Sequence, residues 1–370
     1  MNYLITGKNY TSKLFKQLNT KTIKIIDENE LKKIEISFDE NDRLYVASES
    51  ALDIVLKKSK DSQKKKVTEI LKNKINFRKS IAKFHPNFYF KEIALDKIHL
   101  LKLEKGKKFV IKPSKGFFGT AVRAINSKTD LSSLQNELAS EIKKNSAFFS
   151  EAVLSTNTFL IEEFAEGHEY AIDMFYNSDS QPVIMNIYRH PFHKNEKYFH
   201  SIYYTGKEFY NEIKERFLEI FIQYNSVFKV KNYPIHCEFK INGENVIPIE
   251  FNPLRYGGFG LADLTFHAFK FDPFNYFFED IEPDWNYIWK NSEYKYFAWA
   301  LGYNGEGLNV KKFIPDHKKY KKFVQNYFEY VELDHTINPA FSIAYFPFND
   351  LSRVQNFLEI EYKDYFNEKK

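Results

Sequence analysis

The chain has 370 residues, a net charge of +5, a hydrophobic fraction of 43% and a single cysteine. This length predicts two or three domains, the hydrophobic fraction excludes wholesale disorder, and the lone Cys237 excludes an intramolecular disulfide or a zinc cluster of thiolates. The mild, spread-out charge argues against nucleic acid as a partner, and the lack of a run of ~18 apolar residues or of a signal-peptide pattern predicts a cytoplasmic protein without a membrane partner.

Residues 1–72 show the alternation of a small α/β unit. Short apolar strands are expected at 3–5, 22–26 and 44–48, with helical stretches at 11–18 and from about 49 onward. Strand–helix–strand alternation predicts a parallel, Rossmann-like sheet. The lone Gly7 after the first strand is not a dinucleotide-binding fingerprint.

The remainder of the chain mixes helices and strands. Between 73 and 164 we expect helices at 74–84 and 130–144, and strands at 108–113, 122–125 and 158–164. Between 165 and 285 we expect strands at 169–176, 182–188, 235–241 and 246–251 around a long helix at 208–228. The tail, 286–370, is rich in Tyr, Phe and Trp and indicates strands at 296–301 and 340–346 and a helix near 351–359. The pattern predicts an α/β and α+β protein of four units: 1–72, 73–164, 165–285 and 286–370.

A glycine-containing loop between two strands is the first candidate site. Lys112 ends an alternating strand and is followed by Pro-Ser-Lys-Gly-Phe-Phe-Gly. Ser114, Gly116 and Gly119 would let backbone N–H groups approach a phosphate, and Lys112 would add a point charge for the same anion. An ordinary hairpin loop has a similar composition, so this segment alone leaves both interpretations open. It is not a P-loop, because the Gly-Lys-Ser/Thr ending before a helix is missing.

An acidic segment follows the next apolar strand. It reads Glu162-Glu163-Phe-Ala165-Glu-Gly-His-Glu169. The backbone of such a crossover can meet the edge of an adenine, and a carboxylate seven residues after Glu162 can accept hydrogen bonds from ribose hydroxyls. The alternative is a pair of strands with acidic residues merely flanking their turn.

A hairpin at 234–253 carries the most informative pattern. Two apolar strands flank an Asn-Gly turn, and each is interrupted by a glutamate, Glu238 in the first and Glu250 in the second. A carboxylate in a buried strand is costly unless it is paired or bound to a metal. Glu238, Glu250 and Asn252 offer the oxygen ligands that Mg²⁺ prefers, and Arg255 follows them, placed to meet a phosphoryl group.

The register of this hairpin tests the metal hypothesis. A two-residue loop in a regular ladder would place Glu238 and Glu250 on opposite faces, because side chains alternate along a strand. A shared metal therefore requires a loop of odd length. We expect a three-residue loop around Gly243, despite the bias of Asn-Gly toward two residues.

The three segments, in this order, resemble the ATP-grasp superfamily of the carboxylate–amine ligase type. The Lys-Pro loop, the Glu-Glu-Phe crossover and the Glu…Glu-x-Asn hairpin are its recurring signature. Upstream, Lys74 with Arg78 one helical turn later is similar to the family's first nucleotide lysine. The resemblance covers about 1–265. It implies an N-terminal Rossmann-like domain, two α+β lobes clasping ATP, the second with the metal site, and a C-terminal α+β extension.

The resemblance also implies roles for individual residues. Lys74 and Lys112 would contact the phosphates of ATP, and residues 114–119 would form a phosphate lid. Glu162 and the backbone of Glu163 and Ala165 would hold adenine, and Glu169 the ribose. Mg²⁺, with Mn²⁺ as an alternative, would bind Glu238, Glu250 and Asn252. Arg255, with Lys112, would act in phosphoryl transfer. One departure is visible, since Leu254 stands where many relatives have the arginine directly after Asn-Pro.

The implied reaction is a ligation. ATP phosphorylates a carboxylate to an acyl phosphate, an amine displaces the phosphate, and ADP and phosphate are released. Positioning and charge neutralisation dominate such chemistry. The partners would be a small-molecule carboxylate and an amine, from amino acids or small peptides; a homodimer is left open. Two alternatives stay open: an ATP-grasp kinase or carboxylase, and an ATP-binding regulatory protein without turnover.

Substrate residues are the least defined. Arg189 and His190 follow a strand of the second lobe, and Arg189 is one of few arginines, whose planar fork suits a carboxylate. Gly257 and Gly258 fit a loop in contact with substrate. Asp263 and His267, just after this loop, are weaker candidates. Arg189 either binds the substrate carboxylate or belongs to a cluster of polar residues on a surface loop. Cys237, inside a strand, is expected to point away from Glu238.

Overall fold

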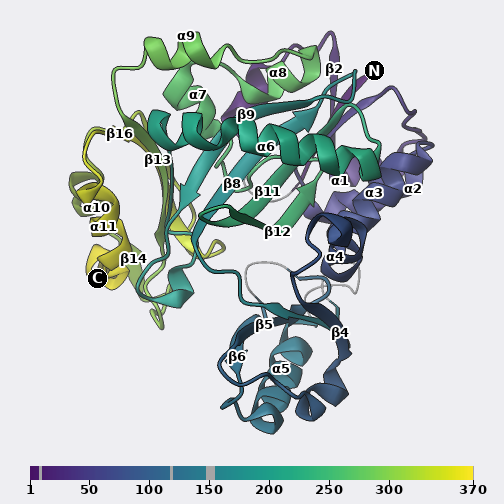
Figure 1. The fold of residues 1–370 in the computed structure, drawn as a ribbon. Helices are drawn as coiled ribbons and strands as arrows, with labels where there is room; N and C mark the ends of the chain where they lie inside the picture. Colours follow the sequence, from purple (N-terminus) through teal and green to yellow (C-terminus); the bar gives the residue numbers. More distant parts are fainter. Residues whose placement is uncertain (8–10, 117–119, 147–154, 370) are drawn as a thin grey trace.

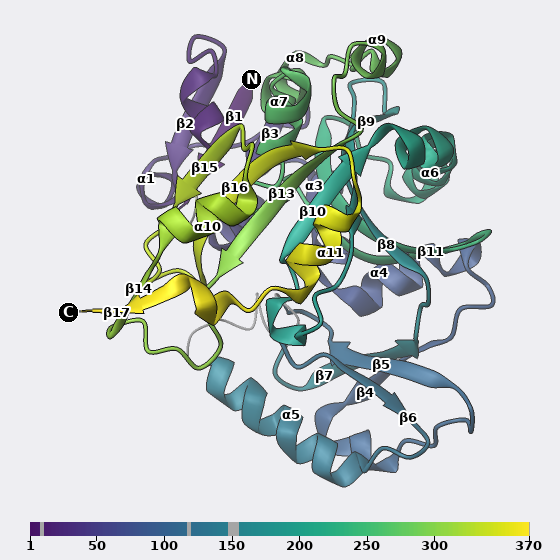
Figure 2. The same cartoon turned by 90° about the vertical axis from the view of Figure 1, so that its left-hand side faces the viewer.

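The structure is a computed structural model that describes residues 1–7, 11–116, 120–146 and 155–369. It has a large body and a smaller lobe, which hangs below the body in Figure 1 and lies at the lower right after a quarter turn in Figure 2. The body has one continuous hydrophobic core, and the small lobe has a second core of its own. The prediction of mixed α/β and α+β architecture is confirmed.

A three-stranded parallel sheet begins the body, as the alternation of the first 72 residues predicts. Its strands are β1 (Asn2–Thr6), β2 (Ile23–Asp27) and β3 (Arg43–Val46), in the order β2-β1-β3. The segment expected as a helix at 11–18 is a short 3-10 helix. The connecting helices are η1 (Lys13–Gln17), α1 (Glu28–Lys33), η2 (Glu49–Ala51), α2 (Leu52–Lys58) and α3 (Ser62–Lys72). Gly7 is required here, because a Cβ atom would lie 2.3 Å from Ser48 Oγ.

The small lobe is a four-stranded antiparallel sheet covered by a helix. The strands are β4 (Phe90–Ala94), β5 (Lys108–Pro113), β6 (Arg123–Asn126) and β7 (Thr158–Glu163), in the order β4-β7-β5-β6. Its helices are η4 (Leu95–Leu100) and α5 (Leu131–Ser146), while α4 (Lys74–Ile81) and η3 (Ala82–Phe84) lead into it from the body. Asn73 caps α4, accepting hydrogen bonds from the backbone N–H groups of Ile75 and Asn76 at 3.0 and 3.1 Å.

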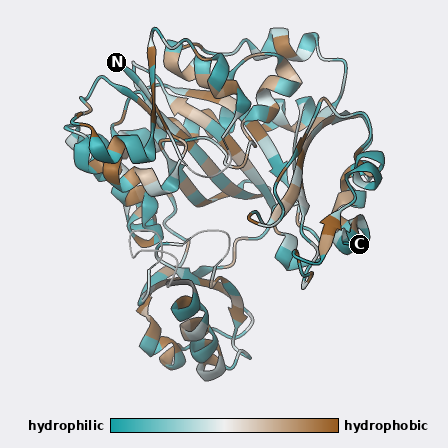
Figure 3. Ribbon diagram, turned by 180° about the vertical axis from the view of Figure 1, so that it is seen from behind, coloured by the Kyte–Doolittle hydropathy of each residue, from teal (hydrophilic) through white to brown (hydrophobic). Residues whose placement is uncertain are grey.

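An eight-stranded antiparallel sheet forms the centre of the body, in the order β12-β11-β8-β9-β10-β13-β16-β15. Its strands are β8 (His168–Tyr176), β9 (Pro182–His190), β10 (Ile202–Gly206), β11 (Tyr233–Asn242), β12 (Asn245–Pro253), β13 (Tyr296–Tyr303), β15 (Glu329–Glu332) and β16 (Ala340–Phe348). Apolar residues follow these strands through the interior (Figure 3). Because β13 pairs with β10, the aromatic tail continues the sheet of residues 165–285. The boundaries of the four expected units stay predictions.

Helices cover this sheet and join it to the N-terminal unit. Figure 1 shows the long α6 (Lys207–Phe228) across the sheet and short helices at the top. The remaining elements are η5 (Glu196–Tyr198), α7 (Asp263–Phe269), α8 (Pro273–Glu279), α9 (Trp285–Lys290), β14 (Phe313–Pro315), α10 (His317–Val324), α11 (Ser352–Glu359), η6 (Tyr362–Tyr365) and β17 (Phe366–Glu368). Among the described residues, no helix combines the length and the apolar character that a membrane span needs.

The β11–β12 hairpin corrects the predicted loop. The strands pair as far as Asn242 and Asn245, so the loop has two residues, and the expectation of an odd loop was wrong. The register instead shifts between Glu238 and Phe239, where Pro248 pairs with Phe239 but Glu250 pairs with Glu238. A β-bulge at Ile249 therefore supplies the one-residue shift, and the two glutamates face the same side.

Candidate functional site

The two faces of the large sheet differ sharply in character. On β11, Cys237 and Phe239 are fully buried on the face toward α6, where Phe239 packs on Phe217 with ring centroids 4.9 Å apart. His236 and Glu238 alternate with them and occupy the other face. Cys237 thus points away from Glu238, as predicted. The polar face is where residues of the predicted site gather.

Glu162 lies between two cations in the small lobe. One carboxylate oxygen is 2.6 Å from Lys112 Nζ, and the other accepts a hydrogen bond from Arg78 Nε at 2.6 Å. All three side chains are at most 6% exposed. A contact of Glu162 with adenine stays a prediction, because each carboxylate oxygen can accept a further hydrogen bond beside those from the two cations. Its evident role is to hold Lys112.

The charge balance of this cluster favours an anion. Burial raises the pKa of Glu162, but the charges of Arg78 and Lys112 outweigh it and bring the pKa down to about 2. Burial lowers the pKa of Lys112, and Glu162 opposes that change. With contacts of 2.6 Å on both sides, we take the three groups as ionised. One carboxylate against two cations leaves a net positive charge, which suits a phosphate.

The predicted metal ligands come together on the large sheet. Glu238 and Glu250 are cross-strand neighbours, and Asn252 follows on the same face of β12. Lys74, from the start of α4, reaches Glu250 with its Nζ 3.0 Å from Oε1, and the same Nζ donates to the carbonyl of Gly116 at 3.3 Å. Lys74 thus joins the strand of the predicted metal ligands, the predicted lid and the helix between the lobes.

The chemistry of the donors fits a hard divalent cation. Two carboxylates and an amide oxygen are ligands of the Mg²⁺ type. Within the described part of the chain, no three His, Cys, Asp or Glu side chains gather as a metal site. The predicted set therefore depends on Asn252 as its third ligand. Burial raises the pKa of Glu238, but the hydrogen bond and charge of His236, with weaker effects of two other histidines, lower it to about 2, so Glu238 is ionised at neutral pH.

Arg255 lies beside these ligands. Its Nη2 donates to Asn252 Oδ1 at 2.9 Å, and its Nε is 3.5 Å from a carboxylate oxygen of Glu49. The inserted Leu254 adopts a left-handed backbone, with φ of 59°, and is buried. This turn absorbs the extra residue and keeps Arg255 next to Asn252. The departure from the family pattern does not remove the arginine from the site.

The expected ribose and adenine groups lie along the edge between the lobes. Glu169 is 5% exposed, with His190 Nδ1 2.6 Å from one oxygen and Lys240 Nζ 3.3 Å from the other. The backbone N–H of Glu163 donates to the carbonyl of Tyr89 at 3.0 Å, and Ala165 lies in the connection between β7 and β8. Direct contact of these groups with a nucleotide stays a prediction.

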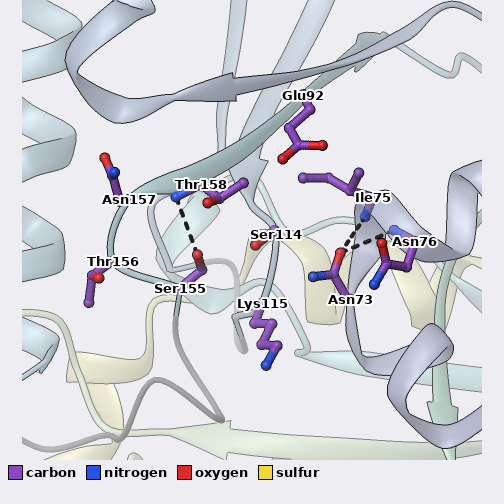
Figure 4. Close-up of a pocket in the computed structure, with 10 residues that line it drawn as sticks. All are labelled: Asn73, Ile75, Asn76, Glu92, Ser114, Lys115, Ser155, Thr156, Asn157 and Thr158. Carbon is purple, nitrogen blue, oxygen red and sulfur yellow. Dashed lines mark hydrogen bonds between the residues drawn. The ribbon is translucent and has the colours of Figure 1, made fainter. Parts of the chain in front are cut away.

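A polar cavity of about 340 Å³ adjoins the predicted lid. Figure 4 shows it between the start of α4, the segment before β7 and the end of β5, with Ser114 and Lys115 on one wall and Glu92 opposite. Ser114 is buried, and its carbonyl accepts a hydrogen bond from the backbone N–H of Lys74 at 2.8 Å. Gly119 lies outside the described residues.

The structure separates the substrate candidates. Arg189 projects to the α6 face, where its Nη1 donates to the hydroxyl of Tyr170 at 2.8 Å, so strand alternation keeps it from the metal ligands. His190 is on the correct face but contacts Glu169. Gly257 and Gly258 follow Arg255 and line a small cavity of about 40 Å³.

That cavity lies between the N-terminal unit and the loop after β12. Its other lining residues are Ser12, Phe15, Tyr45, Ala47, Arg255, Tyr256, Phe259, Gly260, Asp263 and Phe274. His267 lies farther along, with its ring tilted against that of Tyr345 at a centroid distance of 4.3 Å and its Nε2 3.3 Å from Glu329. Gly257, Gly258 and Asp263 thus remain next to the predicted reaction centre, whereas Arg189 does not.

Sequence reasoning missed several polar residues of this face. Asp173, His236 and Lys240 interrupt apolar strands at alternate positions, which is the same signal that identified Glu238. Arg78 was recognised as part of a pattern but not as the partner of Glu162. His236 and Lys240 lie two residues before and after Glu238, and this spacing alone would have placed them on the same face of the strand as Glu238.

Comparison with known proteins identifies the domain at the centre of this site. Residues 106–263, from β5 through β12 to the start of α7, match the ATP-grasp domain. A search of curated protein sequences found no match.

Solved structures show the same fold over nearly the whole chain. An L-amino acid ligase from Bacillus licheniformis superposes with a TM-score of 0.67 at 13% identity, over 100% of this chain and 98% of that one. An N5-carboxyaminoimidazole synthase from Aspergillus clavatus, in complex with ADP and a ribonucleotide, superposes with a TM-score of 0.64 at 12% identity, over 96% of this chain and 97% of that one. N5-carboxyaminoimidazole ribonucleotide synthetase from Thermotoga maritima superposes with a TM-score of 0.61 at 13% identity, over 99% of this chain and 98% of that one. At these identities the likeness establishes the fold.

Proposed function

We propose, from the premise that this chain contains an ATP-grasp domain, that it is a Mg²⁺-dependent ligase that joins a carboxylate to an amine with ATP. The observation that carries the proposal is the meeting of Glu238, Glu250 and Lys74. Two carboxylates on paired strands share one face, and a lysine from the helix between the lobes lies 3.0 Å from the second of them. The full-length likeness to an amino-acid ligase supports this class of reaction.

The reaction proceeds in two transfers. An oxygen of the substrate carboxylate attacks the γ-phosphorus of ATP, the bond to the β,γ-bridging oxygen breaks, and ADP leaves. The amine then attacks the acyl carbon, loses a proton, and phosphate departs as the amide forms. Little covalent work falls to the protein, so binding and charge neutralisation supply the catalysis.

Each residue of the site has a task in this scheme. Lys112, held by Glu162, and Lys74 bind phosphate oxygens. Glu238, Glu250 and Asn252 hold Mg²⁺, which when bound neutralises charge on the phosphate oxygens. Arg255, next to Asn252, stabilises the phosphoryl group in transfer. Glu250 and Asn252 each have a cationic neighbour, Lys74 and Arg255, and these two cations turn to the phosphates when the nucleotide and its metal arrive.

The nucleotide takes the edge between the lobes. Adenine meets the backbone of Glu163 and Ala165, and Glu169 accepts from the ribose. Ser114 and Gly116 contact the phosphates. The acyl substrate lies beside Gly257 and Gly258, next to Arg255. Amino acids or small peptides are the substrates we favour, since the cavity lined by these glycines is small.

The test is a screen of amino acids and dipeptides as acceptor pairs, with ADP and product mass read together. We expect ADP release that depends on both substrates and on Mg²⁺, a product lighter by one water than its parts, and an intermediate that hydroxylamine traps. Phosphate retained in the product would indicate a kinase, and dependence on bicarbonate a carboxylase. Nucleotide binding without turnover across the screen would favour a regulatory protein.

A further inference from the structure

A buried carboxylate that none of these roles uses lies at the middle of the polar face. Asp173 of β8 is 1% exposed and is flanked along its strand by apolar residues. Burying a carboxylate without partners is costly, so its contacts must explain why it is tolerated there.

Asp173 accepts hydrogen bonds from three separate elements. His236 Nδ1 of β11 donates to Oδ1 at 2.7 Å, and the backbone N–H of Gly257 donates to the same oxygen at 2.8 Å. The hydroxyl of Tyr188 on β9 donates to Oδ2 at 3.0 Å. One side chain therefore joins two neighbouring strands and the loop that follows β12.

Two of these contacts lead to different halves of the proposed site. His236 presents its other nitrogen, Nε2, 3.6 Å from Oε1 of the metal ligand Glu238. Gly257 begins the glycine loop, residues 257–260, against which the acyl substrate is placed. The loop fits closely there, because a Cβ atom on Gly257 would lie 2.8 Å from the side chain of Leu261. A small displacement of Asp173 would move both halves.

The third contact leads away from both halves. Tyr188 also lies 3.2 Å from Thr265 Oγ1 of α7, which accepts from Asn186 Nδ2 at 3.0 Å. This branch ties α7 to the sheet without touching Glu238 or the glycine loop. It gives an internal control for changes that loosen the core in general.

We propose that Asp173 and His236 are positioning residues that fix the metal ligand Glu238 relative to the glycine loop, so that the metal and the acyl substrate are held in one geometry. The inference rests on the proposed function for the meaning of the glycine loop. Carboxylates that orient a histidine next to a metal site typically change metal affinity or activity 10–100-fold when they are replaced.

The decisive variant is Asp173→Asn, which keeps the shape but removes the charge. An amide has one oxygen, so it cannot accept from His236 and Gly257 on one side and from Tyr188 on the other. The matched control is Tyr188→Phe, which removes the contacts of the hydroxyl with Asp173 Oδ2 and Thr265 Oγ1 but leaves both hydrogen bonds to Oδ1. Affinity for Mn²⁺ is measured by electron paramagnetic resonance, with a non-hydrolysable ATP analogue bound, and nucleotide affinity is measured separately without metal.

We expect Asp173→Asn to weaken Mn²⁺ binding about 10–100-fold. Nucleotide affinity without metal should stay within about twofold, and Tyr188→Phe should leave Mn²⁺ binding within about threefold. Wild-type Mn²⁺ affinity in Asp173→Asn, or an equal loss in Tyr188→Phe, would overturn the proposal. Because these readouts need no substrate, they separate its failure from that of the ligase assignment.

A second variant keeps the inference testable if Asp173→Asn does not fold. His236→Gln cuts the branch to Glu238 but leaves the hydrogen bond between Asp173 and the Gly257 backbone. We expect His236→Gln to raise the dissociation constant of Mn²⁺ and to leave the KM for the acyl substrate unchanged. Asp173→Asn should raise both the dissociation constant of Mn²⁺ and this KM. Two results in His236→Gln would refute separate roles for the His236 and Gly257 contacts: unchanged Mn²⁺ binding, or a rise in KM as large as that in Asp173→Asn.

Discussion

Glu162 and Glu250 are both paired with lysines, yet they are built for different purposes. Glu162 is 4% exposed and is held from both sides, by Lys112 and Arg78 at 2.6 Å. Glu250 is 30% exposed and has a contact of 3.0 Å with Lys74. The first carboxylate belongs to a complete and buried cluster, while the second lies at an accessible place where a cation can be exchanged.

In the proposed site, this difference separates a structural carboxylate, Glu162, from a metal ligand, Glu250. In the small lobe, a fixed anion holds Lys112 in place before any nucleotide arrives, which is the preorganisation that electrostatic catalysis requires. In the large lobe, our proposal has Lys74 neutralise Glu250 until Mg²⁺ binds there. Three measurements test this distinction, and they follow from the largest expected effect to the smallest.

Glu250→Gln should reduce ADP formation at least about 100-fold, because loss of one charge-stabilising group in an active site typically costs 10²–10³. The unfolding midpoint should change by no more than a few degrees, since Glu250 is 30% exposed and Lys74 keeps its hydrogen bond to the carbonyl of Gly116. Glu244→Gln, on the exposed turn of the same hairpin, is the matched control. Turnover close to wild type would remove Glu250 from the metal site.

Glu162→Gln should act on stability instead. It leaves the charges of Lys112 and Arg78 buried together, and breaking a buried pair in this way costs about 3–5 kcal/mol in the free energy of unfolding. Urea denaturation measures the loss. Lys79→Gln, which removes an exposed contact to Glu92, should cost less than ~1 kcal/mol. A similar small loss in both variants would show that the cluster is not a structural unit.

Acid should destabilise the wild type through the same cluster. The pKa of Glu162 is about 2 in the folded chain, below its ordinary value of 4.5, so its ionised form favours folding. This contribution is present above about pH 4.5 and is lost as the pH falls toward 2. Unfolding free energy measured from pH 5 to 3 should therefore fall more steeply in the wild type than in Glu162→Gln. Parallel slopes would contradict the assignment.

The sequence predicted the elements of the site better than their connections. Alternation in 235–241 and 246–251 identified the hairpin and the faces of its glutamates, because burial of one face determines the register. The bulge at Ile249 was not predictable from the turn, since a one-residue shift can be placed anywhere along a ladder. Pro248, directly beside it, was the available signal, because a proline inside a strand indicates an edge strand or a bulge.

Contacts between distant residues explain the other differences. The partner of Glu162 was assigned from a family pattern, but the two cations come from α4 and β5, and only the packing of the small lobe brings them together. Arg189 was favoured for its chemistry, and the alternation of β9 then placed it on the opposite face. The strands β10 and β15 are short and were not predicted at all.

The aromatic tail has a consequence for any shortened form of this protein. Strand β13 pairs along the whole of β10, from Ile202 to Gly206, and β16 pairs with β13 in turn. A chain cut after residue 285 would leave β10 with an open row of backbone donors and acceptors beside freshly exposed rings. Such an edge recruits strands from other molecules, so the catalytic half cannot be expressed by itself without inviting aggregation.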